Sequence, residues 1–172
     1  MSESFNIPDE MDAIVTTGNG GFDKLSHRKV KTPVINKNEV LVKVLAAGMN
    51  NTEINTRIGW YSSSVKLGTE ILHKNVEEGR SFKNAGWNGE TNFPLIQGTD
   101  CCGLVVKCEK DKVNSLLGKR VIIRSCMRVE GFHSRQKVWM ASNFDGAFAE
   151  YVKVPSSEVF PIDCDWSDAD LA

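Results

Sequence analysis

A chain of 172 residues with 41% hydrophobic residues is long enough for one domain with its own core. Its 21 basic and 22 acidic residues leave no excess of positive charge to neutralise a phosphate backbone, which argues against nucleic acid as a partner. No apolar run approaches the roughly 20 residues of a membrane-spanning helix, and the N-terminus lacks the features of a secretory signal, so the sequence predicts a cytoplasmic protein without a membrane partner.

The first part of the chain predicts two paired strands. Residues 1–10 are polar and are expected to form a loose arm. Apolar and β-branched residues predict a strand over 11–17. Asparagine and glycine at 19–21 predict a turn, because both residue types tolerate positive φ, and 24–32 is then expected to pair back as a second strand.

Residues 39–47 form the clearest strand pattern. Their period of two predicts a strand with one face mostly buried, and that face carries Val40, Val42 and Val44. A short helix is expected over 51–57, with Asn50 or Asn51 as its N-cap, since asparagine is a preferred residue there.

The second half predicts further short strands. An irregular stretch at 62–92 comes first, with a possible short helix near 69–78, and a connection of that length is usually functional or mobile. Ser167 is a good N-cap for a last helix, which the chain end cuts after about one turn. Strands are expected in this half over 102–108, 121–124, 147–154 and 159–162. Together with the earlier strands they favour a barrel or a sandwich.

The five cysteines do not suggest a disulfide framework. Their number is odd, none forms a Cys-x-x-Cys pair, and no secretion signal is present. They are expected to be buried, reduced thiols: Cys101, Cys102, Cys108, Cys126 and Cys164.

Several segments, taken in order, resemble the medium-chain dehydrogenase/reductase family. Each is weak alone, but their order and spacing make the resemblance strong, and it covers residues 11–172 apart from 62–92, which looks like an insertion. The segments are 38–44 after Pro33, 46–50, 93–100, 103–106 with 118–121, and 146–152 with Pro155.

The resemblance implies a mainly β fold, a GroES-like, partly open β-barrel with a few short helices. The substrate domain would cover residues 11–162, and 163–172 would begin the linker to a nucleotide-binding domain. The chain itself lacks the Gly-x-Gly-x-x-Gly fingerprint of such a domain after a strand. The fragment is therefore expected to be inactive alone, because the cofactor that supplies the hydride would bind mainly elsewhere.

Zinc-dependent members of the family carry a cysteine and a histidine at positions that match Asn50 and Thr99. Neither asparagine nor threonine is an ordinary zinc ligand, and the acidic residues at the matching positions, Glu53 and Asp100, make a poor zinc site by themselves. Cys101 and Cys102 are adjacent, so their side chains would point to opposite faces of a strand. The three histidines, His27, His73 and His133, are expected to be surface or packed residues. No metal is therefore expected.

Without zinc, the resemblance is closest to quinone oxidoreductases and enoyl reductases, which use NADPH or NADH. A carbonyl oxygen that gains charge needs hydrogen-bond donors. Asn50 is expected to serve the substrate or the cofactor ribose, and Tyr61 to act near the substrate, as the two catalytic candidates. Thr52, Thr99 and Asp100 are weaker substrate-binding candidates. Equally simple roles stay open: a helix cap for Asn50, packing for Tyr61 and a structural hydrogen bond for Asp100.

The resemblance thus implies the substrate domain of an NAD(P)H-dependent oxidoreductase that reduces a small carbonyl, quinone or enone. The full-length protein would form a homodimer or homotetramer. Two alternatives stay open: a stand-alone GroES-like binding or co-chaperonin-like module, and a zinc alcohol dehydrogenase with replaced ligands. Fold alone does not decide between these functions.

Overall fold

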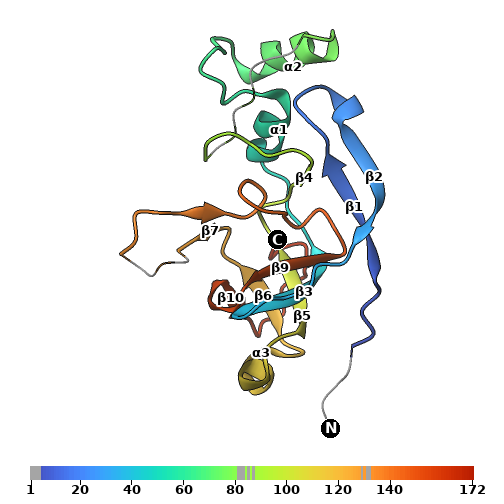
Figure 1. Ribbon diagram of the computed structural model, residues 1–172, viewed down its shortest axis with the longest axis vertical. Helices are drawn as coiled ribbons and strands as arrows, with labels where there is room; N and C mark the ends of the chain where they lie inside the picture. The colour runs from blue at the N-terminus through green and yellow to red at the C-terminus, as the bar shows by residue number, and fades with distance from the viewer. Residues whose placement is uncertain (1–4, 81–83, 85, 87, 129, 131–132) are drawn as a thin grey trace.

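The computed structural model describes residues 5–80, 84, 86, 88–128, 130 and 133–172, and it is dominated by short strands (Figure 1). The strands are β1 (Glu10–Thr16), β2 (Leu25–Lys31), β3 (Glu39–Ala46), β4 (Leu95–Ile96), β5 (Cys102–Lys107), β6 (Arg120–Ile123), β7 (Cys126–Met127), β8 (Val138–Trp139), β9 (Tyr151–Pro155) and β10 (Val159–Pro161). The helices are α1 (Asn51–Ile58), α2 (Thr69–Glu77) and α3 (Val113–Leu116). Short 3-10 turns cover Phe22–Lys24, Lys110–Lys112 and Ser156–Glu158.

The strands form open antiparallel sheets. One sheet has the order β2-β1-β4, a second has β10-β6-β5-β3-β9, and β7 pairs with β8 in a hairpin that projects from the body (Figure 1). This confirms the mainly β fold with a few short helices. The two-residue strands β4, β7 and β8 were not predicted, because two residues are too few to show a period.

The segment just before β9 joins the two larger sheets. The carbonyl oxygen of Phe148 accepts a hydrogen bond from the amide of Ile14 in β1 at 2.8 Å. Two residues on, the carbonyl of Glu150 accepts from Val44 in β3 at 2.9 Å. The chain therefore turns a corner from one sheet to the other here, and β9 begins at Tyr151, later than the sequence predicts.

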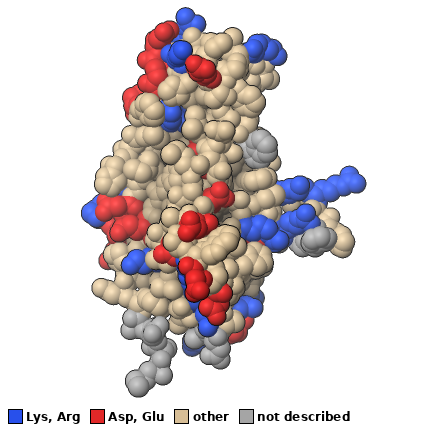
Figure 2. All heavy atoms as spheres, turned by 180° about the vertical axis from the view of Figure 1, so that it is seen from behind, with Lys and Arg blue, Asp and Glu red and all other residues tan. Residues whose placement is uncertain are grey.

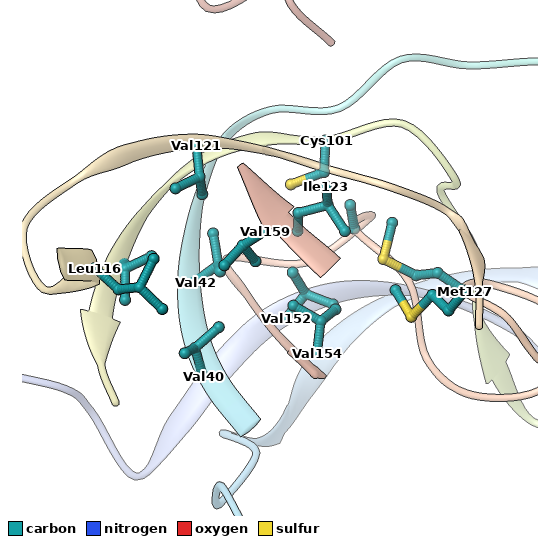
Figure 3. Packing of buried hydrophobic residues seen from close by; sticks show 13 residues of the cluster. Val40, Val42, Cys101, Leu116, Val121, Ile123, Met127, Val152, Val154 and Val159 are labelled. Atoms are coloured by element: carbon teal, nitrogen blue, oxygen red, sulfur yellow. The ribbon is translucent and has the colours of Figure 1, made fainter. Parts of the chain in front are cut away.

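Two hydrophobic clusters pack on opposite faces of β3. Val40 and Val42 belong to the larger cluster, shown in Figure 3, and Leu41 is just as buried in the smaller cluster with β1. The prediction of one buried face was wrong for this half of the strand. β3 lies between β5 and β9, and the β1 sheet covers its second face, so both faces exclude water.

Truncating Leu41 tests this two-sided burial. Leu41→Ala is expected to lower the free energy of unfolding by about 2–5 kcal/mol, because it removes packed atoms and leaves a cavity. Leu45→Ala is the matched control, since Leu45 lies on the same strand but is 42% exposed. Urea denaturation measures both; equal losses for the two variants would contradict the account.

The two longer helices stand together at one end of the molecule (Figure 1). Ile58 of α1 packs against Leu72 and Val76 of α2 in a small third cluster. The buried Arg57 guanidinium donates to the carbonyl of Gly20 at 2.8 Å, which ties the β1–β2 turn to α1. Burial lowers the pKa of Arg57, and nearby carboxylates oppose that shift. Because Leu72 and Val76 pack against α1, helix α2 gives part of the predicted insertion a defined packing role.

The surface carries charges of both signs. Figure 2 shows lysine and arginine interspersed with aspartate and glutamate over one face of the molecule. In the part of the chain that the structure describes, no helix has the length and apolar character needed to cross a bilayer.

Candidate functional site

The candidate site forms where the start of α1 meets the segment that follows β4. Asn50 is the N-cap of α1 and has the extended backbone that this position requires, with φ −114° and ψ 164°. Its side-chain amide donates to the hydroxyl of Thr99 at 3.1 Å and to Oδ2 of Asp100 at 2.7 Å. The structure thus brings together three of the residues that the sequence singled out.

A buried carboxylate lies beneath this group. Glu53 is 4% exposed, and its Oε2 accepts from the backbone amide of Asn50 at 2.7 Å. Its Oε1 accepts from both the amide and the hydroxyl of Thr99, at 3.0 and 2.8 Å. Glu53 therefore fixes the helix start and the Thr99 segment to each other. The Asn-x-x-Glu spacing of a capping box is the sequence signal for half of this arrangement.

Two further polar residues support the site from the sheet, and sequence reasoning missed both. Gln97 donates to the backbone carbonyl of Glu53 at 3.2 Å. The amide oxygen of Gln97 accepts from the hydroxyl of Thr16 in β1 at 2.8 Å, and both side chains are buried. No local pattern reveals a pair 81 residues apart, because it depends on β1 pairing with β4.

A close approach between two glycines sets the path into Thr99. Gly98 has φ +101°, a region that side chains disfavour, and its carbonyl accepts from Ala147 at 2.9 Å. A Cβ on Gly146 would lie 2.4 Å from the Gly98 carbonyl oxygen. The glycine that begins the segment 146–152 therefore lets this segment pack against the chain entering the site.

Gly146→Ala is expected to lower the free energy of unfolding by about 1–3 kcal/mol, or more if the backbone cannot shift, because the added methyl group meets backbone atoms. Gly18→Ala is the control, since an added Cβ there meets nothing within 4 Å. Thermal denaturation of the two variants checks this; a loss in Gly18→Ala as large as in Gly146→Ala would contradict it.

The remaining predicted residues lie around this network or away from it. Thr52 is partly buried in the first turn of α1. Tyr61 lines a different cleft of about 360 Å³ with Asn84 and Glu90, and its ring meets Trp60 edge-on at 5.4 Å. A cleft of about 490 Å³ occurs elsewhere on the chain, but size alone does not make a site. Most of the polar residues that the sequence singled out converge at Asn50 instead.

The donors at the site do not fit a zinc ion. Within the described ranges, no group of three or more histidine, cysteine, aspartate or glutamate side chains is arranged to hold a metal. Cys101 packs into the larger core cluster, whereas the Cys102 thiol donates to Asp168 at 3.6 Å, so the two diverge. Burial chiefly, with the charges of Cys102 and Asp100, raises the pKa of Cys101 to about 12. Burial likewise raises the pKa of Cys102, so both thiols are protonated at neutral pH.

The cysteines should therefore differ sharply in reactivity. Only thiolates attack alkylating agents. Cys164 is exposed, so iodoacetamide at pH 8 is expected to label it first, with Cys101 and Cys102 protected until the chain unfolds. The expectation that all five are buried is confirmed only for Cys101 and Cys102, because Cys164 is exposed and Cys108 and Cys126 are partly buried. Peptide mass spectrometry with and without urea measures the order of labelling; early labelling of Cys101 would contradict it.

The C-terminal segment runs back to the site. Arg120 in β6 donates to the carbonyl of Trp166 at 2.6 Å and to Asp168 at 2.8 Å. The predicted last helix is a turn, in which the Ser167 hydroxyl still accepts from the backbone amide of Asp170 at 3.2 Å. The segment then brings the Ala172 backbone to 2.9 Å from the position of a Cβ on Gly48, and the Asp100 Cβ lies 3.2 Å from the same position.

Sequence comparison places this chain among known oxidoreductases. Residues 36–164 match the family model of the alcohol dehydrogenase GroES-like domain. An L-threonine 3-dehydrogenase of Streptomyces coelicolor is 30% identical over 146 residues, which are 79% of this chain and 36% of that protein. The mitochondrial NAD(P)H oxidoreductase RTN4IP1 of Homo sapiens is 29% identical over 130 residues, 74% of this chain and 26% of that protein.

Solved structures agree with the fold. A protein of Sinorhizobium meliloti 1021 assigned as an alcohol dehydrogenase superposes with a TM-score of 0.76 at 31% identity, covering 96% of this chain and 43% of that one. The quinone oxidoreductase of Coxiella burnetii shares the fold with a TM-score of 0.62 at 23% identity, over 95% and 40% of the two chains. The chain therefore spans less than half the length of each of these proteins.

Proposed function

Because this chain belongs to the alcohol dehydrogenase GroES-like domain family of medium-chain oxidoreductases, we propose that it is the substrate domain of an NAD(P)-dependent enzyme that works without zinc on a small carbonyl, quinone or enone. The observation that carries the proposal is the network of Asn50, Thr99 and Glu53. In this network an amide, a hydroxyl and a carboxylate are hydrogen-bonded to one another, and the resemblance matches Asn50 and Thr99 to the metal ligands of zinc-dependent members. An amide and a hydroxyl are poor ligands for zinc, and the Glu53 carboxylate already accepts three hydrogen bonds.

The nicotinamide, when bound, supplies or accepts the hydride. This chain supplies the substrate side. Asn50, Thr99 and Asp100 form its polar wall, Glu53 holds that wall in place, and Thr52 lies in the adjoining first turn of α1. Pre-organised polar groups of this kind contribute to catalysis because they need no reorganisation during the reaction. Tyr61 contributes only if a substrate reaches its separate cleft.

The cofactor would bind chiefly outside these residues, so the fragment alone would be inactive. A relative named as an NAD(P)H oxidoreductase favours a nicotinamide, and the choice between NADPH and NADH belongs to that other part of the protein. A cytoplasmic homodimer or homotetramer remains the proposed state of the full-length protein.

Steady-state assays of the full-length protein test this function. NADPH and NADH are each offered with quinones, enones and simple ketones, before and after treatment with a strong zinc chelator. The expected result is oxidation of the nicotinamide that survives chelation. Activity that disappears with the chelator and returns with zinc would defeat the zinc-free proposal, and turnover by residues 1–172 alone would defeat the assignment of the cofactor site to another part.

A further inference from the structure

We propose that Asp100, and not Asn50, meets the substrate oxygen and exchanges its proton during hydride transfer. This inference rests on the proposed function and deepens it. It reverses the expectation from sequence, in which Asn50 donates to a carbonyl oxygen.

The hydrogen-bond donors of the network are already used. An asparagine amide has two N–H donors, and those of Asn50 go to Thr99 and Asp100. The opposite orientation of the amide would place its oxygen against the Asp100 carboxylate, so the network itself selects this one. The Thr99 hydroxyl in turn donates to Glu53. Neither Asn50 nor Thr99 keeps a hydrogen for a ligand.

Asp100 retains unused capacity. Its Oδ2 accepts from Asn50, and among the described residues no hydrogen bond is recorded to its Oδ1. A carboxylate has about four acceptor positions, and Asp100 is only partly buried, unlike Glu53 and Thr99. Its backbone carbonyl also accepts from Gly48 at 3.3 Å, which fixes the start of the side chain. The group that remains open to a ligand is therefore an acceptor.

The position of Asp100 suits contact with a bound substrate. Its Cβ and the Ala172 backbone both lie close to the position that a Cβ on Gly48 would occupy, at 3.2 and 2.9 Å, so only glycine leaves room beside them. A substrate bound beside Gly48 would therefore meet the carboxylate of Asp100.

The proton balance is simple in both directions. In oxidation of an alcohol, the substrate O–H bond breaks and its proton passes to Asp100, while the carbon–hydrogen bond breaks and its electron pair leaves as hydride to the oxidised nicotinamide. In reduction, the carboxyl proton returns to the oxygen as hydride reaches the carbon, and water restores the proton to Asp100. The hydrogen bond from Asn50 to Oδ2 fixes the orientation of the carboxyl group.

A first experiment needs no turnover. The full-length protein without nicotinamide is titrated with cyclohex-2-enol and with cyclohex-2-enone, a pair that differs at the oxygen. The alcohol is expected to bind at least about fivefold more tightly, since its hydroxyl donates to the Asp100 carboxylate, whereas the enone would place an acceptor oxygen against it. Asp100→Asn should abolish that preference, and Asp111→Asn, an exposed carboxylate in a surface pair with Lys112, should keep it.

A second experiment uses the reaction. Asp100→Ala is expected to lower kcat about 10²–10⁴-fold, the usual range for general acid–base catalysis. Added formate should restore part of this rate, and a purely structural role would not show such rescue. Circular dichroism and the melting temperature confirm that the variant folds.

The outcomes separate the two proposals. Equal binding of alcohol and enone, or a preference that survives in Asp100→Asn, overturns the role of Asp100 whether or not the enzyme turns over. A kcat in Asp100→Ala within threefold of the unchanged protein also overturns it. Absence of hydride transfer with every nicotinamide and substrate defeats the proposed function, while the binding preference still decides which group meets the oxygen.

Discussion

Glu53→Ala is expected to lower the free energy of unfolding by about 3–5 kcal/mol. The side chain is 4% exposed and accepts three hydrogen bonds, from the amide of Asn50 and from the amide and hydroxyl of Thr99. Its removal leaves these donors without partners in a buried place, where each costs about 1–3 kcal/mol. Urea denaturation measures the loss.

Two companion variants make this result specific. Glu53→Gln keeps one acceptor oxygen but turns an N–H group toward a donor, so an intermediate loss is expected. Glu70→Ala is the surface control, because its side chain is 86% exposed and its pair with Lys74, at 3.4 Å, is worth at most about 0.5 kcal/mol. A loss below 1 kcal/mol in Glu53→Ala would show that the network contributes little to stability.

Arg124→Met should destabilise the protein by a similar amount, about 3–5 kcal/mol, because it leaves a buried charge without its partner. Glu158 is 2% exposed, and its Oε2 accepts from two nitrogens of Arg124 at 2.7 Å. The guanidinium itself lies half in solvent, above the ring of Phe160. The loss of stability in Arg124→Met is therefore expected to arise from the buried Glu158 carboxylate that is left without its partner, more than from lost contacts of the arginine.

The double variant Arg124→Met/Glu158→Leu isolates that cause. Replacing both members of a buried pair by apolar residues is often close to neutral, so the double variant is expected to be more stable than Arg124→Met alone. Guanidinium chloride denaturation of both, with Glu158→Leu, completes the cycle. Additive losses would contradict this explanation.

Local pattern predicted the strands that have enough residues to show a period. The strands at 11–17 and 39–47 appear within about one residue of their predicted ends, as β1 and β3. Pattern failed where the chain turns between sheets: residue 147 was expected inside a strand that starts only at Tyr151. It also failed for Leu41, since alternation cannot show that a second sheet covers the opposite face.

The candidate site shows the same division. Resemblance pointed to Asn50, Thr99 and Asp100, and hydrogen bonds join all three. It did not point to Gln97 or Thr16, because their pairing exists only after β1 and β4 come together. Residue type also did not reveal which hydrogens are already engaged, and this decides whether a group can serve a ligand. Asn50 turned out to cap the helix and to join the network at once.

The hydrogen bonds from Arg120 to the last turn affect where this domain can accept an insertion or a fusion. One guanidinium holds the backbone of Trp166 and the carboxylate of Asp168, so the chain emerges in a set direction, beside Gly48. A flexible spacer inserted after Asp168 would make the orientation of a protein fused downstream less fixed relative to this domain. The same spacer among the exposed residues 66–68, before α2, would leave the direction of the C-terminal segment unchanged. This loop is therefore the better place to insert a reporter.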